Sequence, residues 1–200
     1  IDTLNNLIAS GDQVNEIKAV LSGSLNFIFN NFSLNNPFHK IVLKAQEEGY
    51  TEPDPKIDLS GIDVARKILI LARESGLKIE LNDIEISPFL PKKSLKTSNN
   101  KEFFQSLIEH EDYFNKILKN ANENDSKLKY VASLKNGKAK VGLEEIPKGH
   151  NFYDLEGSDN IVLFYTNRYS NQPLIVKGAG AGAEVTASGI FADIIRIGKR

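Results

Sequence analysis

Residues 52–67 read EPDPKIDLSGIDVARK, an acidic, proline-rich stretch that runs into an apolar helix. Pro53 and Pro55 each follow an acid, and an X-Pro step holds the backbone outside the helical region and stiffens it. Apolar residues then recur at helical spacing, which predicts a helix from about Gly61 to Glu74. Because a stiff loop can hold carboxylates in fixed directions, this stretch is the first place to look for a binding site.

The predicted helix is apolar around most of its circumference. On a wheel of ~100° per residue, its apolar residues cover well over half of the circle: Val64, Ala65, Ile68, Leu69, Leu71 and Ala72. Asp63 and Lys67 lie one turn apart on the remaining side, where packing of the helix would partly desolvate them. Glu52, Asp54 and Asp58 lie just upstream. Together these residues indicate a pocket that binds a cationic group and polarises an oxygen with a lysine. The Asp63–Lys67 pair is also compatible with an ordinary i,i+4 ion pair at the surface.

Two further segments have glycine or serine at a strand-to-helix junction. In GAGAGAEVTASG, residues 178–189, alternate glycines would let the backbone approach a ligand, and the helix N-terminus could receive an anion. This segment is not a GxGxxG dinucleotide fingerprint, which belongs near the start of a βαβ unit. In LSGSLNFIF, residues 21–29, Ser24 could offer its hydroxyl to a ligand or cap the following helix. A tight turn and a plain helix cap are the structural alternatives for the two segments.

The order of the elements predicts an α+β fold. Helical patterns come early and strand patterns come late, with a typical hairpin turn at residues 135–138. Helices are predicted at residues 3–9, 24–32, 38–48, 61–74, 101–122 and 185–197, a strand and turn at 78–85, and strands at 17–21, 128–134, 139–143, 160–168 and 173–177. This order is typical of helices packed on one face of a mostly antiparallel or mixed sheet. We expect one domain over residues 1–200.

Composition and charge exclude several classes of function. The 25 basic and 26 acidic residues are interleaved and give a net charge of −1, so no field would attract nucleic acid or an anionic membrane. The sequence has no cysteine, which excludes disulfides and a thiol nucleophile, and its three histidines are too dispersed for a metal site. No stretch approaches the ~20 apolar residues of a membrane span, and the chain starts without a signal-peptide pattern. A cytoplasmic location is therefore expected.

Taken together, the three segments resemble the homoserine dehydrogenase family. The motifs occur in the family's order: SG-S/T-L near the start, then GYTEPDP-x-x-DLSG-x-DVARK, then GAGAG-x-x-VTA-x-G-x-x-ADIIRI near the end. The middle motif is long and specific, and the resemblance extends over essentially the whole chain, including LKYVASL and GSDNIVLFYTNRY. Ser24 stands where the family usually has threonine, and the hydroxyl is kept.

The resemblance implies roles for individual residues. Lys67 matches the catalytic acid/base, and Asp63 matches an acid that binds substrate and supports hydride transfer. Glu52 matches the acid that holds the amino group of the substrate. The remaining expected substrate contacts are Asp58, Ser24 and Tyr50, and the expected contacts with the nicotinamide cofactor are Gly49 and Gly182.

The resemblance also implies an activity, a cofactor and a partner. The expected reaction is the NAD(P)-dependent interconversion of aspartate 4-semialdehyde and homoserine, with a Rossmann domain before Ile1 that binds most of the NAD or NADP. By itself the chain would then be a folded but inactive catalytic fragment, and we expect a homodimer joined through residues 128–177. The alternative is a non-catalytic dimerisation or ligand-sensing module, which has no need for Lys67 to point toward Glu52 and Asp58.

Overall fold

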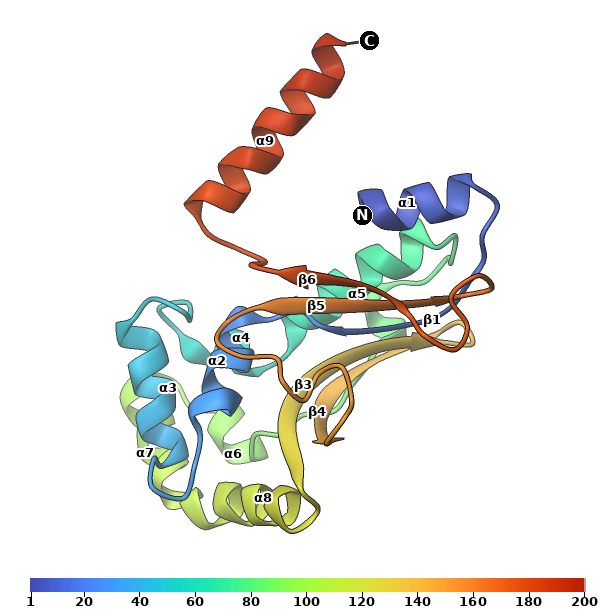
Figure 1. The fold of residues 1–200 in the computed structure, drawn as a ribbon. Helices are drawn as coiled ribbons and strands as arrows, with labels where there is room; N and C mark the ends of the chain where they lie inside the picture. The colour runs from blue at the N-terminus through green and yellow to red at the C-terminus, as the bar shows by residue number, and fades with distance from the viewer. Residues whose placement is uncertain (200) are drawn as a thin grey trace.

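A six-stranded sheet of order β2-β4-β3-β1-β5-β6 forms the centre of the computed structural model, which describes residues 1–199 (Figure 1). Its strands are β1 (Val14–Val20), β2 (Glu85–Ile86), β3 (Ser126–Lys135), β4 (Lys138–Pro147), β5 (Asn160–Thr166) and β6 (Leu174–Gly178). Neighbouring strands are antiparallel except β2 and β4, which are parallel. The N-terminal strand β1 therefore lies between two strands from the second half of the chain.

Helices cover one face of this sheet (Figure 1). They are α1 (Asp2–Ala9), α2 (Gly23–Asn31), α3 (Phe38–Glu47), α4 (Pro55–Leu59), α5 (Ile62–Glu74), α6 (Lys92–Leu95), α7 (Asn100–Glu109) and α8 (Glu111–Glu123), with a 3₁₀ turn at Leu81–Asp83. Successive residues of a strand point to opposite faces. Accordingly, Tyr130 and Ala132 of β3 join the core under the helices, whereas Val131 joins a smaller cluster on the other face. The expected α+β class is confirmed.

The second face is partly covered by the segment between β4 and β5. Phe152 and Leu155 of this segment are buried against Val131 and Ile161 of the sheet. The segment ends in the loop that precedes β5. This loop lies beside α2, where Asn26 Nδ2 donates to the Asp159 carbonyl at 3.1 Å.

Two of the predicted elements are wrong in detail. The helix predicted over 101–122 is divided at His110 into α7 and α8. The division was missed because the apolar spacing of Phe103, Leu107, Phe114 and Leu118 continues across the residue where the helix is interrupted. The strand and turn predicted at 78–85 occur in the opposite order, as a 3₁₀ turn at Leu81–Asp83 followed by the two-residue strand β2. The short helices α4 and α6 lie in segments for which no helix is predicted, since helices of four or five residues are too short to show a period.

α9 (Ala183–Gly198) extends from the end of β6 away from the sheet (Figure 1). Its large apolar side chains are exposed: Val185, Ile190, Phe191, Ile194, Ile195 and Ile197. Arg196 forms an ion pair with Asp2 of α1, which links the two ends of the described chain. Within residues 1–199 no helix combines the length and the apolar character that crossing a membrane requires.

Candidate active site

The start of α5 is fixed by a glycine. Gly61 has φ of 75°, a left-handed conformation that L side chains rarely adopt, and it is the residue that precedes α5. A Cβ added there would overlap the ring of Tyr130, which is buried beneath it. The turn at Gly61 therefore lets α5 begin directly against the core, and it sets the direction in which the first turn of α5 presents its side chains.

Lys67 is held at two of its three donor positions. Its Nζ lies 2.7 Å from Asp63 Oδ2, one turn back along α5, and donates to the carbonyl of Leu21 at 2.9 Å. Leu21 follows the end of β1, so the lysine connects α5 to the sheet. The side chains of Lys67 and Asp63 are 42% and 50% exposed, so solvent and a bound molecule can both reach them. One N–H of the ammonium has no acceptor within residues 1–199 and is available to an oxygen atom of a ligand.

Asp58 connects the acidic loop to α2. Its Oδ1 accepts a hydrogen bond from the Ser24 hydroxyl at 2.9 Å, and its Oδ2 accepts one from the backbone N–H of Glu52 at 2.9 Å. Ser22, not Ser24, caps α2, since the Ser22 hydroxyl accepts from the Leu25 N–H at 3.2 Å. The helix cap predicted at Ser24 is therefore wrong, because the capping residue lies two positions earlier. The Ser24 hydroxyl instead donates to Asp58.

The proline-rich loop is fixed from outside the site. The Pro53 carbonyl accepts hydrogen bonds from Gln46 and Asn100, each at 2.8 Å. Asp54 caps α4 by accepting from the Lys56 N–H at 3.1 Å. Of the acids singled out in the sequence, Asp54 therefore has a structural role. Glu52 is left exposed at the rim of the site.

Tyr50 and Gly49 close α3 beside these acids. Gly49 adopts φ of 74°, and the Tyr50 N–H donates to the carbonyl of Ala45 at 2.8 Å, which ends the helix. The Tyr50 ring then stacks on Phe27 of α2 with 4.3 Å between ring centroids. This stack ties the end of α3 to α2 and turns the loop that follows toward Asp58.

The stretch between β6 and α9 forms the opposite wall. Gly178 pairs with Asn160 across β5 and β6, and a Cβ at Gly180 would overlap the Asn160 side chain. Gly182 has φ of 122° and immediately precedes α9. Glycine is thus required here for close packing at Gly180 and for the backbone conformation at Gly182.

These walls enclose a cavity of about 410 Å³. It is lined by all eight residues to which the family resemblance gave a role, namely Ser24, Gly49, Tyr50, Glu52, Asp58, Asp63, Lys67 and Gly182, but not by Asp54. Their individual roles stay predictions. Ser158 and Asn160 also line the cavity and were missed. The polar GSDN turn before β5 was the signal for them, but nothing in the sequence joins that turn to a site about 100 residues upstream.

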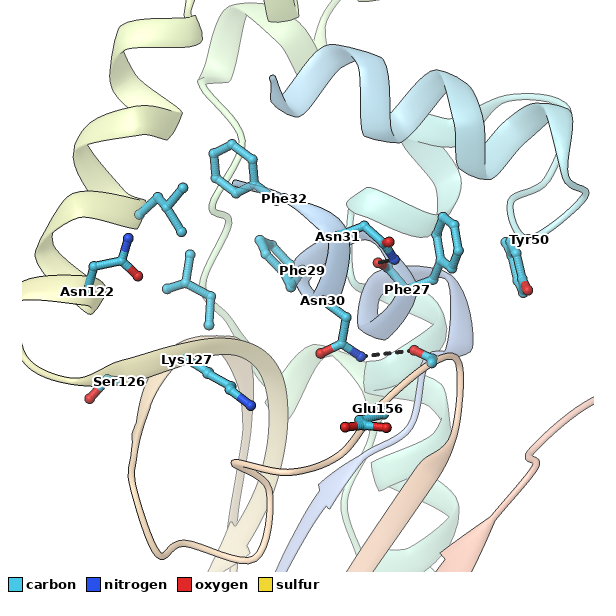
Figure 2. Close-up of a pocket in the computed structure, with 13 residues that line it drawn as sticks. Phe27, Phe29, Asn30, Asn31, Phe32, Tyr50, Asn122, Ser126, Lys127 and Glu156 are labelled. Carbon is cyan, nitrogen blue, oxygen red and sulfur yellow. Dashed lines mark hydrogen bonds between the residues drawn. The ribbon is translucent and has the colours of Figure 1, made fainter. Parts of the chain in front are cut away.

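A second cavity, of about 620 Å³, lies beside the second half of α2 (Figure 2). Figure 2 shows Phe27, Phe29 and Phe32 on one side of it and Ser126 and Lys127 on another. Tyr50 lines both cavities. The second cavity is larger, but its lining has no lysine paired with an acid one helical turn away. We therefore assign the chemistry to the smaller cavity.

Known proteins are similar to this chain in sequence. The family model described as homoserine dehydrogenase matches residues 1–195. The chain is 46% identical over 199 residues to bifunctional aspartokinase/homoserine dehydrogenase 2, chloroplastic, of Zea mays, covering 98% of this chain and 22% of that protein. It is 39% identical over 211 residues to a homoserine dehydrogenase of Paracoccidioides brasiliensis, covering all of this chain and 57% of that protein. The chain thus spans less than two thirds of these relatives.

Solved structures share the architecture. A Candida auris protein of unknown function superposes with a TM-score of 0.93 at 39% identity, over 100% of this chain and 57% of that one. A homoserine dehydrogenase from Thiobacillus denitrificans superposes with a TM-score of 0.74 at 22% identity, over 97% of this chain and 41% of that one. At that identity the second likeness supports the fold alone.

Proposed function

The chain belongs to the homoserine dehydrogenase family, and from this premise we propose that it is the substrate-binding and catalytic part of an NAD(P)-dependent enzyme that interconverts L-aspartate 4-semialdehyde and L-homoserine. One observation carries the proposal: the Lys67 ammonium is held by Asp63 and the Leu21 carbonyl at the wall of a cavity that also contains acids. A sensing or dimerisation module is not favoured, since the Zea mays and Paracoccidioides brasiliensis relatives are both named as homoserine dehydrogenases, the first of them fused to an aspartokinase.

The substrate carries an α-ammonium group, which suits the acidic side of the cavity. The Asp58 carboxylate is already used by Ser24 and by the Glu52 N–H, so Asp58 shapes the wall. Glu52 is exposed and makes no side-chain ion pair within residues 1–199, so its carboxylate is the natural partner for the ammonium of the substrate. A cavity of about 410 Å³ can enclose an amino acid of this size.

The glycines of the site fit a flat cofactor ring. A Cβ added at Gly49 or Gly182 would meet no atom within 4 Å, so both glycines border open space at the cavity. A nicotinamide bound there supplies the hydride. Glycine has no side chain that could contact the ribose of the cofactor, so the choice between NAD and NADP is expected to depend on residues outside this chain.

In the reductive direction, negative charge develops on the aldehyde oxygen as the carbonyl carbon is reduced. Lys67 donates a hydrogen bond to this oxygen and then its proton, which gives the alcohol, and it accepts the proton back in the oxidative direction. Asp63, at 2.7 Å, fixes the position of the ammonium and can accept a hydrogen bond from the product hydroxyl. The hydrogen bond between Ser24 and Asp58 holds the acidic loop in place against α2 while the substrate is bound.

We propose that residues 1–200 form the catalytic and dimerisation domain and that a nucleotide-binding domain precedes it in the complete protein. The greater length of the relatives supports this, as does the exposed apolar surface of α9, which a further domain could cover. A cytoplasmic location stays a prediction, and the Zea mays relative is named as chloroplastic.

The activity can be tested directly. The purified full-length protein is expected to oxidise NADPH or NADH when L-aspartate 4-semialdehyde is added, and the chain of residues 1–200 alone is expected to show no turnover. Loss of reduced-cofactor absorbance measures both. Absence of turnover by the full-length protein with either cofactor would contradict the proposed function, and turnover by the isolated chain would contradict the proposed division into domains.

We expect the protein to be a homodimer joined through residues 128–177. β6 is an edge strand, and its Ile175 and Val176 are each 43% exposed, which leaves apolar surface for a partner. Ile175→Lys should shift the sedimentation coefficient toward that of a monomer. Ile108→Lys, at a similarly exposed position on α7, is the matched control and should leave the dimer intact. A wild-type protein that sediments as a monomer at high concentration would contradict the expectation.

A further inference from the structure

Lys129, in the middle of β3, is a fully buried lysine with no acidic partner. Its side chain is 0% exposed. Its Nζ donates to Asn26 Oδ1 at 2.9 Å, to Asn30 Oδ1 at 2.5 Å and to the Leu155 carbonyl at 2.5 Å. All three acceptors are neutral, and no carboxylate of residues 1–199 forms an ion pair with this ammonium. Burying a cation without a counter-ion costs stability, so its presence calls for a functional explanation.

The two asparagines use their other atoms to hold a loop, residues 155–160. Asn26 Nδ2 lies 3.2 Å from the Gly157 carbonyl and 3.1 Å from the Asp159 carbonyl. Asn30 Nδ2 donates to the Gly157 carbonyl at 3.0 Å, the bond drawn as a dashed line in Figure 2. Lys129, Asn26 and Asn30 therefore form a clamp: the lysine orients both amides, and the amides together with the lysine bind the backbone carbonyls of the loop.

The clamped loop is packed against both glycine-bearing walls of the active-site cavity. A Cβ added at Gly23 would lie 3.0 Å from the Ser158 carbonyl oxygen, and one added at Gly180 would overlap the Asn160 amide. Between these contacts, Ser158 and Asn160 line the cavity. A shift of the loop would therefore move part of the cavity wall, while α5 with Lys67 makes no hydrogen bond to the loop within residues 1–199.

We propose that Lys129, acting with Asn26 and Asn30, is a positioning residue for substrate binding: the clamp holds residues 155–160 between Gly23 and Gly180 and so fixes the wall formed by Ser158 and Asn160. The inference rests on the proposed function of that cavity. Because the reacting groups are on α5, the clamp sets the affinity for substrate more than the rate of the chemical step.

The electrostatic surroundings of Lys129 indicate that the fold tolerates a neutral residue at this position, although the clamp does not. Burial lowers the pKa of the lysine to about 8; Lys127 and Lys177 act in the same direction, while Asp154 and Glu156 oppose them. The charged form is thus disfavoured by its site, and Lys129→Met removes the cost of burying it while keeping the length of the side chain. The variant is expected to fold, with its asparagines no longer oriented.

The test compares four variants of the full-length protein by steady-state kinetics. Lys129→Met should raise KM for L-aspartate 4-semialdehyde about tenfold and leave kcat within about threefold. Lys129→Arg keeps the charge and the donors and should return KM to within about threefold of wild type. Asn26→Asp keeps an acceptor for Lys129 but turns an oxygen toward the loop carbonyls, so it should resemble Lys129→Met. Ser106→Ala, which removes a buried 2.8 Å hydrogen bond to Ser94 away from both cavities, is the matched control and should change neither constant.

Hydrogen exchange of the backbone amides of residues 155–160, measured without substrate, separates this inference from the proposed function. Exchange should be faster in Lys129→Met and Asn26→Asp but not in Ser106→Ala. Unchanged exchange in the first two variants overturns the clamp, and so does a KM that stays at the wild-type value while exchange is faster. If the full-length protein does not turn over this substrate, the proposed function fails, and the exchange measurement still decides whether Lys129 holds the loop.

Discussion

Replacing Lys67 by alanine is expected to lower kcat of the full-length protein by on the order of 10²–10⁴-fold, the usual contribution of a general acid. The lysine is the group whose remaining N–H can reach the aldehyde oxygen, since its other partners are Asp63 and the Leu21 carbonyl. Truncation leaves the developing charge on that oxygen without a donor. Steady-state kinetics measures the effect, and circular dichroism checks that the variant is folded.

Two companion variants give this experiment its specificity. Lys67→Arg should not restore kcat, because a guanidinium does not give up its proton near neutral pH. Glu52→Gln should act on binding instead: it removes the charge expected to hold the substrate ammonium, so KM should rise more than kcat falls. If Lys67→Ala kept a kcat near the wild-type value, the lysine would be a structural ion-pair partner of Asp63 and the proposed mechanism would be wrong.

The second large effect is expected at Gly61. Gly61→Ala places a Cβ at φ of 75° and into the ring of the buried Tyr130, so it should lower the free energy of unfolding by about 3 kcal/mol or more, from backbone strain together with overpacking. Gly76→Ala is the matched control. Gly76 has a similar φ of 88° with nothing within 4 Å of an added Cβ, so that substitution should cost about 1 kcal/mol from strain alone. Urea denaturation of the full-length proteins gives both values.

The clash can be separated from the strain by changing Tyr130. Tyr130→Leu removes the outer atoms of the ring, so Gly61→Ala should cost less in that background than in the wild type, and the difference measures the contact. Tyr130→Phe should be tolerated, because the Tyr130 hydroxyl is buried with no hydrogen-bond partner in the described part of the chain. Equal costs of Gly61→Ala in the Tyr130→Leu and wild-type backgrounds would show that the ring is not what requires glycine.

Much of the local structure could be predicted because short-range rules govern it. The period of the apolar residues predicted α5 to within a residue or two, and the spacing of Asp63 and Lys67 then placed them together, as the 2.7 Å ion pair shows. The hairpin of β3 and β4 followed from the Asn136-Gly137 turn in the same way. The division of the predicted 101–122 helix at His110 was not predictable from period, since the apolar spacing continues across the break.

By itself, then, the sequence determined the α5 helix, the stiff acidic loop, the glycine turns and the motifs by which the family is identified, because each depends on neighbouring residues and on backbone sterics. Only the tertiary structure decided which of these segments meet. Ser24 reaches Asp58 across 34 residues, and Lys129 reaches Asn26 across 103. The Lys129–Asn26 contact exists because β3 pairs with β1, the strand that leads into α2. The Ser24–Asp58 contact comes instead from the packing of α4 against α2. Strand order is set by burial of the whole sheet face, so no local pattern records it. That order places Ser158 and Asn160 at the cavity and Lys129 beneath the loop that carries them.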